Sequence, residues 1–394
     1  MLKGKTVVLG VTGSIAAYKI ANLARMLVKQ HCEVHVLMTQ NATNFINPIT
    51  FETLTKHKCL IDTFDRNFEF SVEHVALAKA ADVVMIAPAS ANVIGKIENG
   101  IADDMLTTTV MACPCKKIVS PAMNHNMFHN PIVQDNIEKL KHYGYEIVEP
   151  AHGMLANGDM GDGRMPDEEL LFEYIVKEIA FEKDMTGKKV LVTAGATVEA
   201  IDPVRFITNH SSGKMGFALA KNAMLRGADV TLVMGKCDSE PPVFVNTVKV
   251  QSAKDMYDAV IERADSMDII VKAAAVADYR PKNVSSEKVK KQDGNMSIEL
   301  ERTDDILKTL GERKNGQFIC GFSMETENML ENSRKKLEKK NCDMIVANNL
   351  KQDGAGFGGN TNIVTIITKD DEVQLEKMTK DEVAEKIFDF ILSR

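Results

Sequence analysis

The chain has 394 residues, of which 44% are hydrophobic and 26% are charged, as expected for a soluble globular protein with more than one domain. Its net charge of −7 and its lack of a long basic run argue against nucleic acid as the main partner. No segment has the roughly 18 consecutive apolar residues of a membrane helix, and no signal sequence is recognisable, so we expect a cytoplasmic protein without a membrane partner.

The first part of the chain predicts an α/β unit. Apolar runs at 6–11, 33–38 and 81–87 predict buried parallel strands, with a shorter strand at 117–119. Apolar residues at helical spacing from Ile20 to Val28 predict a helix after the first strand. Ligands of such sheets bind at the carboxyl ends of the strands, where small polar loops occur at 13–15, 39–41, 88–92 and 121–124. These loops suit a ligand with a phosphate and a planar ring.

The strand pattern restarts at 188–195, after a charged stretch at 178–189. The segment 211–216 is expected to open a helix that ends at Gly227, with strands at 229–234, 268–272, 344–347 and 363–368 and a last helix at 380–392. The predicted fold class is therefore α/β, with two doubly wound, Rossmann-like parallel-sheet domains in series. We predict their bounds as 1–184, flavodoxin-like, and 185–394.

Several motifs have both a functional and a structural interpretation. Ser211–Lys214 opens a helix, so it is either a phosphate site or a plain helix cap. Asp278 follows a strand, where nucleotide and Mg²⁺ contacts are common. Lys288 lies in a lysine-rich stretch that is either a solvated loop or a flap over an anionic substrate. His74 alone is more often structural, and the GxGxxG at 354–359 precedes a strand, which predicts a turn.

Taken in order, the motifs resemble a known family. Segments 10–19, 87–92, 99–104 and Pro121-Ala122-Met123-Asn124, together with the His74 segment, are similar to the flavin-containing cysteine decarboxylases. Segments 193–197, 202–205, 208–216 and 274–279 are similar to phosphopantothenate–cysteine ligases. Nearly end to end, the chain resembles the bacterial bifunctional phosphopantothenoylcysteine decarboxylase/phosphopantothenate–cysteine ligases of coenzyme A biosynthesis.

For the first half, the resemblance implies FMN bound between subunits, oxidation of the substrate thiol, loss of CO₂ and return of hydride. His74 matches the catalytic histidine and Asn124 the residue that binds the substrate carboxylate. The positions expected to contact FMN lie in the loops at the strand ends: Gly13, Ser14, Thr39, Pro88, Ser90, Asn92, Asp103 and Met123.

For the second half, the resemblance implies activation of 4′-phosphopantothenate by CTP through an acyl-cytidylate, and then attack by the amine of cysteine. Asn209 would hold the acyl-cytidylate, Lys288 would act in catalysis, and Asp278 would also meet Mg²⁺ on the triphosphate. The substrate-binding set is Ser211, Ser212, Gly213, Ala274, Asp278, Asp305, Phe322, Lys336 and Lys340. The family also implies a homo-oligomer with trimeric flavin domains and dimeric ligase domains.

One position departs from the family pattern. Asn157 stands where the family's substrate lid carries a cysteine that protonates the last intermediate, and a carboxamide is no general acid near neutral pH. Asp159, His152 or water replaces it as the donor, or the flavin half stops at the oxidised enethiol, or the residue has been changed deliberately. The sequence leaves these alternatives open.

Two other functions compete with the bifunctional enzyme. Asn157 is compatible with a first domain that acts as a regulatory scaffold, as some relatives of this flavin fold do. Retention of His74, Asn124, Asn209 and Lys288 argues against a scaffold for the whole chain. A general NAD(P) oxidoreductase is disfavoured because the dinucleotide fingerprint lacks its strand–helix context.

Overall fold

We describe a computed structural model of the chain, in which residues 2–63, 73–156, 158–290, 296–325, 327–349 and 358–394 are placed. The chain divides into two compact units, residues 1–181 and 182–394. Within the placed residues, no helix is long and apolar enough to span a membrane.

The first unit is built on a parallel sheet with the strand order β2-β1-β3-β4-β5. Its strands are β1 (Thr6–Val11), β2 (Glu33–Met38), β3 (Val83–Ala89), β4 (Lys116–Pro121) and β5 (Glu146–Ile147). β3 is buried along its whole length, as expected when helices cover both faces of a parallel sheet.

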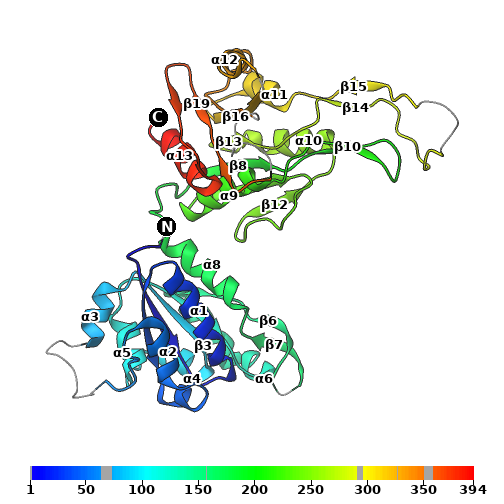
Figure 1. The fold of residues 1–394 in the computed structure, drawn as a ribbon. Helices are drawn as coiled ribbons and strands as arrows, with labels where there is room; N and C mark the ends of the chain where they lie inside the picture. The colour runs from blue at the N-terminus through cyan, green and yellow to red at the C-terminus, as the bar shows by residue number, and fades with distance from the viewer. Residues whose placement is uncertain (1, 64–72, 157, 291–295, 326, 350–357) are drawn as a thin grey trace. The chain divides into compact units, whose positions relative to one another are not determined.

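Two groups of helices pack around this sheet (Figure 1). One group contains α1 (Lys19–Lys29), α2 (Pro48–Thr55) and α8 (Glu168–Ile179). The other contains α3 (Glu73–Ala80), α4 (Ala91–Glu98), α5 (Met105–Ala112) and α7 (Pro131–His142). Short helices η1 (Ile15–Tyr18), η2 (Gln40–Asn44) and α6 (His125–Phe128) follow β1, β2 and β4. A hairpin of β6 (Ala151–Met154) and β7 (Met160–Arg164) contacts α6.

The second unit has a larger sheet with the order β12-β11-β8-β13-β16-β17-β19-β20. The parallel strands are β8 (Lys189–Ala194), β11 (Asp229–Met234), β12 (Asn246–Lys249), β13 (Ile269–Lys272), β16 (Phe318–Glu325) and β17 (Met344–Asn349). β19 (Thr365–Ile367) and β20 (Glu372–Gln374) continue the sheet antiparallel, so the sheet is mixed at one edge. Its helices are α9 (Lys214–Leu225), α10 (Ala253–Ala264), α11 (Ile306–Arg313), α12 (Met329–Lys339) and α13 (Lys380–Leu392).

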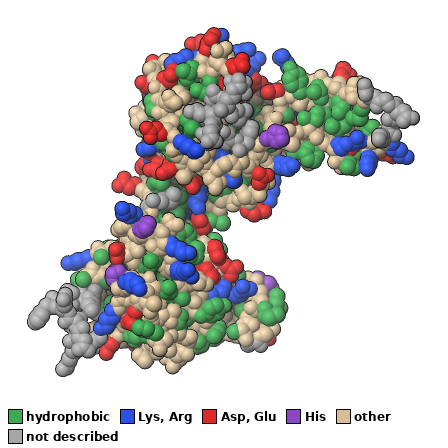
Figure 2. All heavy atoms as spheres, in the orientation of Figure 1, with side chains coloured by type: hydrophobic (Ala, Val, Ile, Leu, Met, Phe, Trp, Pro, Cys, Tyr) green, Lys and Arg blue, Asp and Glu red, His purple; other side chains and the backbone are tan. Residues whose placement is uncertain are grey.

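Short strand pairs complete this unit. They are β9 (Val198–Ala200) with β10 (Phe206–Thr208), β14 (Tyr279–Pro281) with β15 (Leu300–Arg302), and β18 (Thr361–Asn362) with β21 (Met378–Thr379). The β14–β15 pair extends away from the sheet as an arm (Figure 1). Exposed apolar side chains gather on this arm (Figure 2), including Tyr279, Val284, Ile298 and Leu300.

The predicted α/β class with two parallel sheets in series is confirmed, and the predicted strands correspond to β1, β2, β3, β4, β8, β11, β13, β17 and β19. The 363–368 segment was expected in a parallel sheet, but β19 pairs antiparallel with β17. Among the described residues between the two strands lies the short strand β18 but no helix, whereas a parallel pairing needs a crossover, usually a helix, that returns the chain to the other end of the sheet. Most of the predicted glycine turn at 354–359 lies outside the described residues.

Candidate functional site

Polar side chains predicted to meet the cofactor or, for Asn124, the substrate begin the helices at the carboxyl edge of the first sheet. Ser14, Thr39, Ser90 and Asn124 are the N-caps of η1, η2, α4 and α6, and each side chain accepts a hydrogen bond from a backbone N–H of its own helix. Parallel strands bring all four loops to the same edge, and the first N–H groups of helices attract anions.

Thr12 connects two of these loops. Its hydroxyl is fully buried, donates to the carbonyl of Pro88 at 2.6 Å and accepts the N–H of Ser90 at 2.9 Å. Both hydrogen-bonding functions of the hydroxyl are therefore used. The loop after β1 and the loop after β3 are held as one surface, so a ligand meets a preformed edge.

A cavity of about 540 Å³ lies beside this edge. Its walls come from η1 and its N-cap, from the loop after β4, and from the β6–β7 hairpin. Among the predicted residues, Ser14, Met123 and Asn124 line it. Ile15, Tyr18 and Met154 also line it, and each is more than half exposed. The cavity thus has an apolar rim suited to a flat ring or to a second protein surface.

Other residues predicted for the flavin half lie outside the cavity lining. These are Gly13, Thr39, Pro88, Ser90, Asn92, Asp103 and His74. Asp103 is exposed and pairs with Lys96 at 2.7 Å, while the neighbouring Asp104 caps α5. His74 is half-buried at the start of α3. Asn157, at the lid position, lies outside the described residues.

In the second unit, two adjoining cavities of about 270 and 700 Å³ lie at the carboxyl ends of β13 and β16. They share the side chains of Lys272, Asp278 and Lys336. The smaller one brings together predicted residues from four chain segments: Ser211, Ser212, Gly213, Ala274, Asp278, Phe322 and Lys336. The larger one adds Asp305 and Lys340. One continuous, strongly polar site results.

Lys272 was not predicted as a site residue. It ends β13, and burial together with the nearby charge of Lys336 lowers its pKa to about 8. A strand whose last residue is a half-buried lysine is an unusual signal, because such a charge needs a partner. In the absence of a ligand this ammonium group is held in an unfavourable environment, which an anion would relieve.

The other two lysines of the site are held differently. Lys336 of α12 donates to the carbonyl of Phe322 at 2.9 Å, and burial lowers its pKa. Lys340, the C-cap of α12, forms an ion pair with Asp305. Burial is the largest influence on Asp305 and opposes its ionisation, but the hydrogen bonds from Lys340 and from the N–H of Lys308, together with the charges of Lys340 and Lys272, outweigh it and keep the pKa of that carboxyl low. Asp305 also caps α11 through the N–H of Lys308 at 2.9 Å.

The segment 211–213 leads directly into α9. Its N-cap is Gly213, at φ +80°, which has no side chain with which to cap the helix. A Cβ there would lie 2.4 Å from Sγ of Cys237, so a larger residue would be both strained and obstructed. The plain side-chain cap considered from the sequence is therefore absent at this described residue, and the first N–H groups of α9 face a cavity.

Two predicted residues lie apart from the lining of these cavities. The side-chain amide of Asn209 donates to the carbonyl of Ala275 at 3.1 Å, next to the smaller cavity. Lys288 is exposed beyond the arm strand β14. The adjacent Val289 is tied to the buried Asp202, whose carboxylate accepts its N–H at 3.1 Å and also pairs with Arg205. The segment with Lys288 is thus attached to the main body through Asp202.

Comparison with known proteins follows the same division of the chain. Residues 1–180 match the family model described as Flavoprotein, and residues 185–394 match the DNA/pantothenate metabolism flavoprotein C-terminal domain. A coenzyme A biosynthesis bifunctional protein CoaBC of Bacillus subtilis (strain 168) is 48% identical over 94% of this chain and 92% of its own length. The CoaBC of Vibrio cholerae is 42% identical over 99% of this chain and 98% of its own.

Among solved structures, the C-terminal domain of a CoaBC protein is 49% identical, covers 52% of this chain and 95% of its own, and has a TM-score of 0.46. The sequence matches extend over both units and preserve their order. The chain therefore belongs to the family of bifunctional coenzyme A biosynthesis proteins, in which a flavoprotein domain precedes a DNA/pantothenate metabolism flavoprotein C-terminal domain.

Proposed function

We propose that the chain makes 4′-phosphopantetheine in two steps: CTP-dependent ligation of cysteine to 4′-phosphopantothenate, and FMN-dependent decarboxylation of the product. The observation that carries the proposal is the match to bifunctional relatives over nearly the whole chain, with both domains in the same order. The lysine-lined site of the second unit and the apolar-rimmed cavity of the first support one step each.

Ligation requires that an anionic carboxylate attack an anionic nucleotide. In the first step, the carboxylate oxygen of 4′-phosphopantothenate attacks the α-phosphorus of CTP and pyrophosphate leaves, which gives the acyl-cytidylate. In the second step, the cysteine amine attacks the acyl carbon and CMP leaves with the bonding electrons. Lys272, Lys336 and Lys340 offset the phosphate charge, which is the main requirement of such a reaction. The N–H groups at the start of α9 add donors for a phosphate.

Asp278 fits a metal-bound triphosphate. Its carboxylate lines both cavities beside Lys272, so it meets the space that the nucleotide phosphates would fill. Mg²⁺, when bound, would neutralise phosphate charge there, since it prefers carboxylate and phosphate oxygens. Asn209 lies next to this site and would hold the acyl-cytidylate, and Lys288 would approach from the arm side.

Decarboxylation would use the cavity of the first unit. FMN, when bound, would supply reversible two-electron chemistry, as acceptor for oxidation of the substrate thiol and as hydride source for the final reduction. The N-caps Ser14, Thr39 and Ser90 present helix N-termini suited to its phosphate, and Met123 presents an apolar surface suited to its ring. Asn124 caps α6 through its carbonyl oxygen, which leaves the amide NH₂ group to bind the substrate carboxylate.

A partner subunit would complete this cavity. The exposed apolar rim of Ile15, Tyr18 and Met154 supports FMN bound between flavin domains, with His74 contributed across that interface. The apolar arm of the second unit supports pairing of ligase domains. Light scattering on the full chain would test the homo-oligomer, and a monomer would contradict it.

The decisive experiment supplies the purified chain with 4′-phosphopantothenate, cysteine, CTP, Mg²⁺ and FMN and identifies the products by mass spectrometry. Formation of 4′-phosphopantetheine would support both steps and a proton donor other than Asn157. Phosphopantothenoylcysteine alone, or a decarboxylated product two hydrogens lighter, would support ligation with an impaired flavin half. Absence of any cysteine adduct would contradict the proposed ligase.

A further inference from the structure

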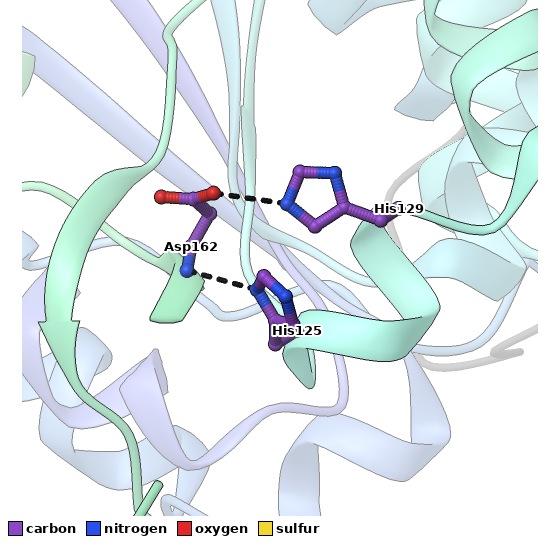
Figure 3. A group of neighbouring side chains, drawn as sticks. All are labelled: His125, His129 and Asp162. Atoms are coloured by element: carbon purple, nitrogen blue, oxygen red, sulfur yellow. Dashed lines mark hydrogen bonds and ion pairs between the residues drawn. The ribbon is translucent and has the colours of Figure 1, made fainter. Parts of the chain in front are cut away.

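Three titratable side chains gather beside the first cavity without a role in the proposed chemistry. His125 and His129 lie at the start and end of α6, and Asp162 belongs to β7 (Figure 3). One possible ligand atom from each, a ring nitrogen of either histidine and an Asp162 carboxylate oxygen, lies within 4.8 Å of the other two. We propose that these residues form a binding site for a divalent transition metal, such as Zn²⁺, Co²⁺ or Ni²⁺, that fastens the β6–β7 hairpin to α6.

The donor set determines the class of ion. Two imidazoles and one carboxylate are the ligands that zinc and its neighbours prefer, whereas Mg²⁺ and Ca²⁺ prefer all-oxygen sites. Histidines four residues apart on a helical turn project to the same side, the arrangement used by helical zinc sites. The metal predicted here therefore differs in kind from the Mg²⁺ expected with CTP.

The existing contacts already bring the donors together. His129 Nε2 lies 2.9 Å from Asp162 Oδ2, and His125 Nδ1 accepts the backbone N–H of Asp162 at 3.1 Å. His125 is therefore neutral at Nδ1, the form that can bind a metal once it gives up this hydrogen bond. Donors about 2.0–2.2 Å from an ion lie at most about 4 Å apart, so the cluster needs only a small contraction.

A fourth residue orients the carboxylate. His152 Nδ1 lies 2.9 Å from Asp162 Oδ1, the oxygen that His129 does not contact. Hydrogen bonds from His152 and His129 keep the pKa of Asp162 below its usual range, so the ligand is ionised at neutral pH. His152 would thus hold Asp162 in position without touching the ion, as residues just outside a metal site commonly do for the residues that bind the ion.

The backbone fixes the two sides of the site against each other. A Cβ on Gly161 would lie 2.7 Å from His125 Nδ1, and one on Gly163 would lie 2.3 Å from the carbonyl oxygen of Met123. The hairpin register shifts between Ala151 and Gly153, an irregularity of the kind that redirects side chains next to binding sites. The hairpin can approach α6 this closely because glycines stand on both sides of Asp162.

The position of the cluster gives the metal a consequence. Asn124 precedes His125, Gly163 follows Asp162, and both line the cavity, where the backbone of Gly163 lies against that of Met123 and Asn124. An ion that joins α6 to β7 would therefore fix the hairpin against α6 at this wall of the cavity. Metal binding should restrain the hairpin even when FMN and substrate are absent.

The test is titration of the full chain with Co²⁺, followed by its visible absorption, in the absence of CTP and substrate. We expect one tightly bound ion, with affinity lost in His129→Ala and Asp162→Asn, and reduced about tenfold or more in His152→Ala. His142→Ala, a change at an exposed histidine of α7, is the matched control and should bind as the wild type does. Equal binding by wild type and His129→Ala would overturn the proposal.

A second variant separates loss of a ligand from loss of folding. His129→Cys should still bind Co²⁺ and should add a thiolate-to-cobalt charge-transfer band that the wild type lacks, because only a ligand at position 129 can produce it. Hydrogen exchange should slow in residues 151–164 on Zn²⁺ addition. If His129→Cys binds Co²⁺ without the new band, the site is refuted. If Zn²⁺ binds without slowing hydrogen exchange in the hairpin, its fastening role is refuted.

Discussion

Replacing Lys272 by methionine should stabilise the ligand-free protein, because the wild type keeps an ammonium group in a half-buried place. Burial and Lys336 lower the pKa of Lys272 from 10.5 to about 8. A difference of about 2.5 between the two values corresponds to about 3 kcal/mol of unfolding free energy. Methionine has similar length and no charge, and solvent reaches part of the Lys272 side chain, so the gain at pH 7 should be a positive fraction of this amount.

The pH dependence of the stability difference follows from the fact that folding lowers the pKa of Lys272. Below pH 8 the lysine is protonated in both states and the full penalty applies. Between pH 8 and 10.5 the folded state loses the proton first and the penalty declines, and above 10.5 both states are neutral. The advantage of Lys272→Met should therefore be largest at pH 7 and nearly absent at pH 10.5.

Urea unfolding of the wild type and Lys272→Met at both pH values would measure this difference. Lys369→Met, at an exposed lysine, is the control and should change stability by less than about 0.5 kcal/mol. Calorimetry should also detect weaker CTP binding by Lys272→Met, since the strained charge is what the nucleotide would relieve. Equal stability of Lys272→Met and wild type at pH 7 would refute the reasoning.

Three further changes test other parts of the structure. Thr12→Val keeps the shape but removes both hydrogen bonds of the buried hydroxyl, so thermal unfolding should show a loss of about 1–3 kcal/mol that Thr12→Ser avoids. Gly163→Ala places a Cβ 2.3 Å from the carbonyl oxygen of Met123, at a backbone φ of +114°. It should lower the retention of flavin on gel filtration. It should also destabilise the protein by at least about 1 kcal/mol more than the control Gly158→Ala, whose Cβ would meet nothing within 4 Å. Lys336→Met should lower the rate of CTP-dependent pyrophosphate release by about a hundredfold; unchanged release would remove this lysine from the chemistry.

The sequence predicts the elements that depend on local pattern. Buried parallel strands such as β3 and β8 are continuous apolar runs, and the polar loops that follow them become helix N-termini at one edge. Helical spacing also places Lys336 and Lys340 on the same side of α12, where both line the larger cavity. These features follow from residues that are close in the sequence.

The features that escaped prediction depend on distant residues. β14 and β15 are three-residue strands separated by a long segment, so no periodicity marks the arm. From the sequence, Lys272 is the polar last residue of an ordinary strand. Its unusual environment depends on the charge of Lys336, which α12 contributes from a distant part of the sequence. The contacts of Asp162 with His129 and His152 join α6 to the hairpin and carry no local signal.

The Asp162 cluster also bears on which group replaces the absent lid cysteine. His152 was one candidate, but its ring is bonded to Asp162, and that carboxylate also holds His129. If His152 gave its proton to the intermediate, its hydrogen bond to Asp162, which orients the hairpin, would weaken during the final reduction. Asp159, at the hairpin turn before β7, and water remain compatible with an intact cluster. The proton donor and the proposed metal site would then operate on different parts of the same hairpin.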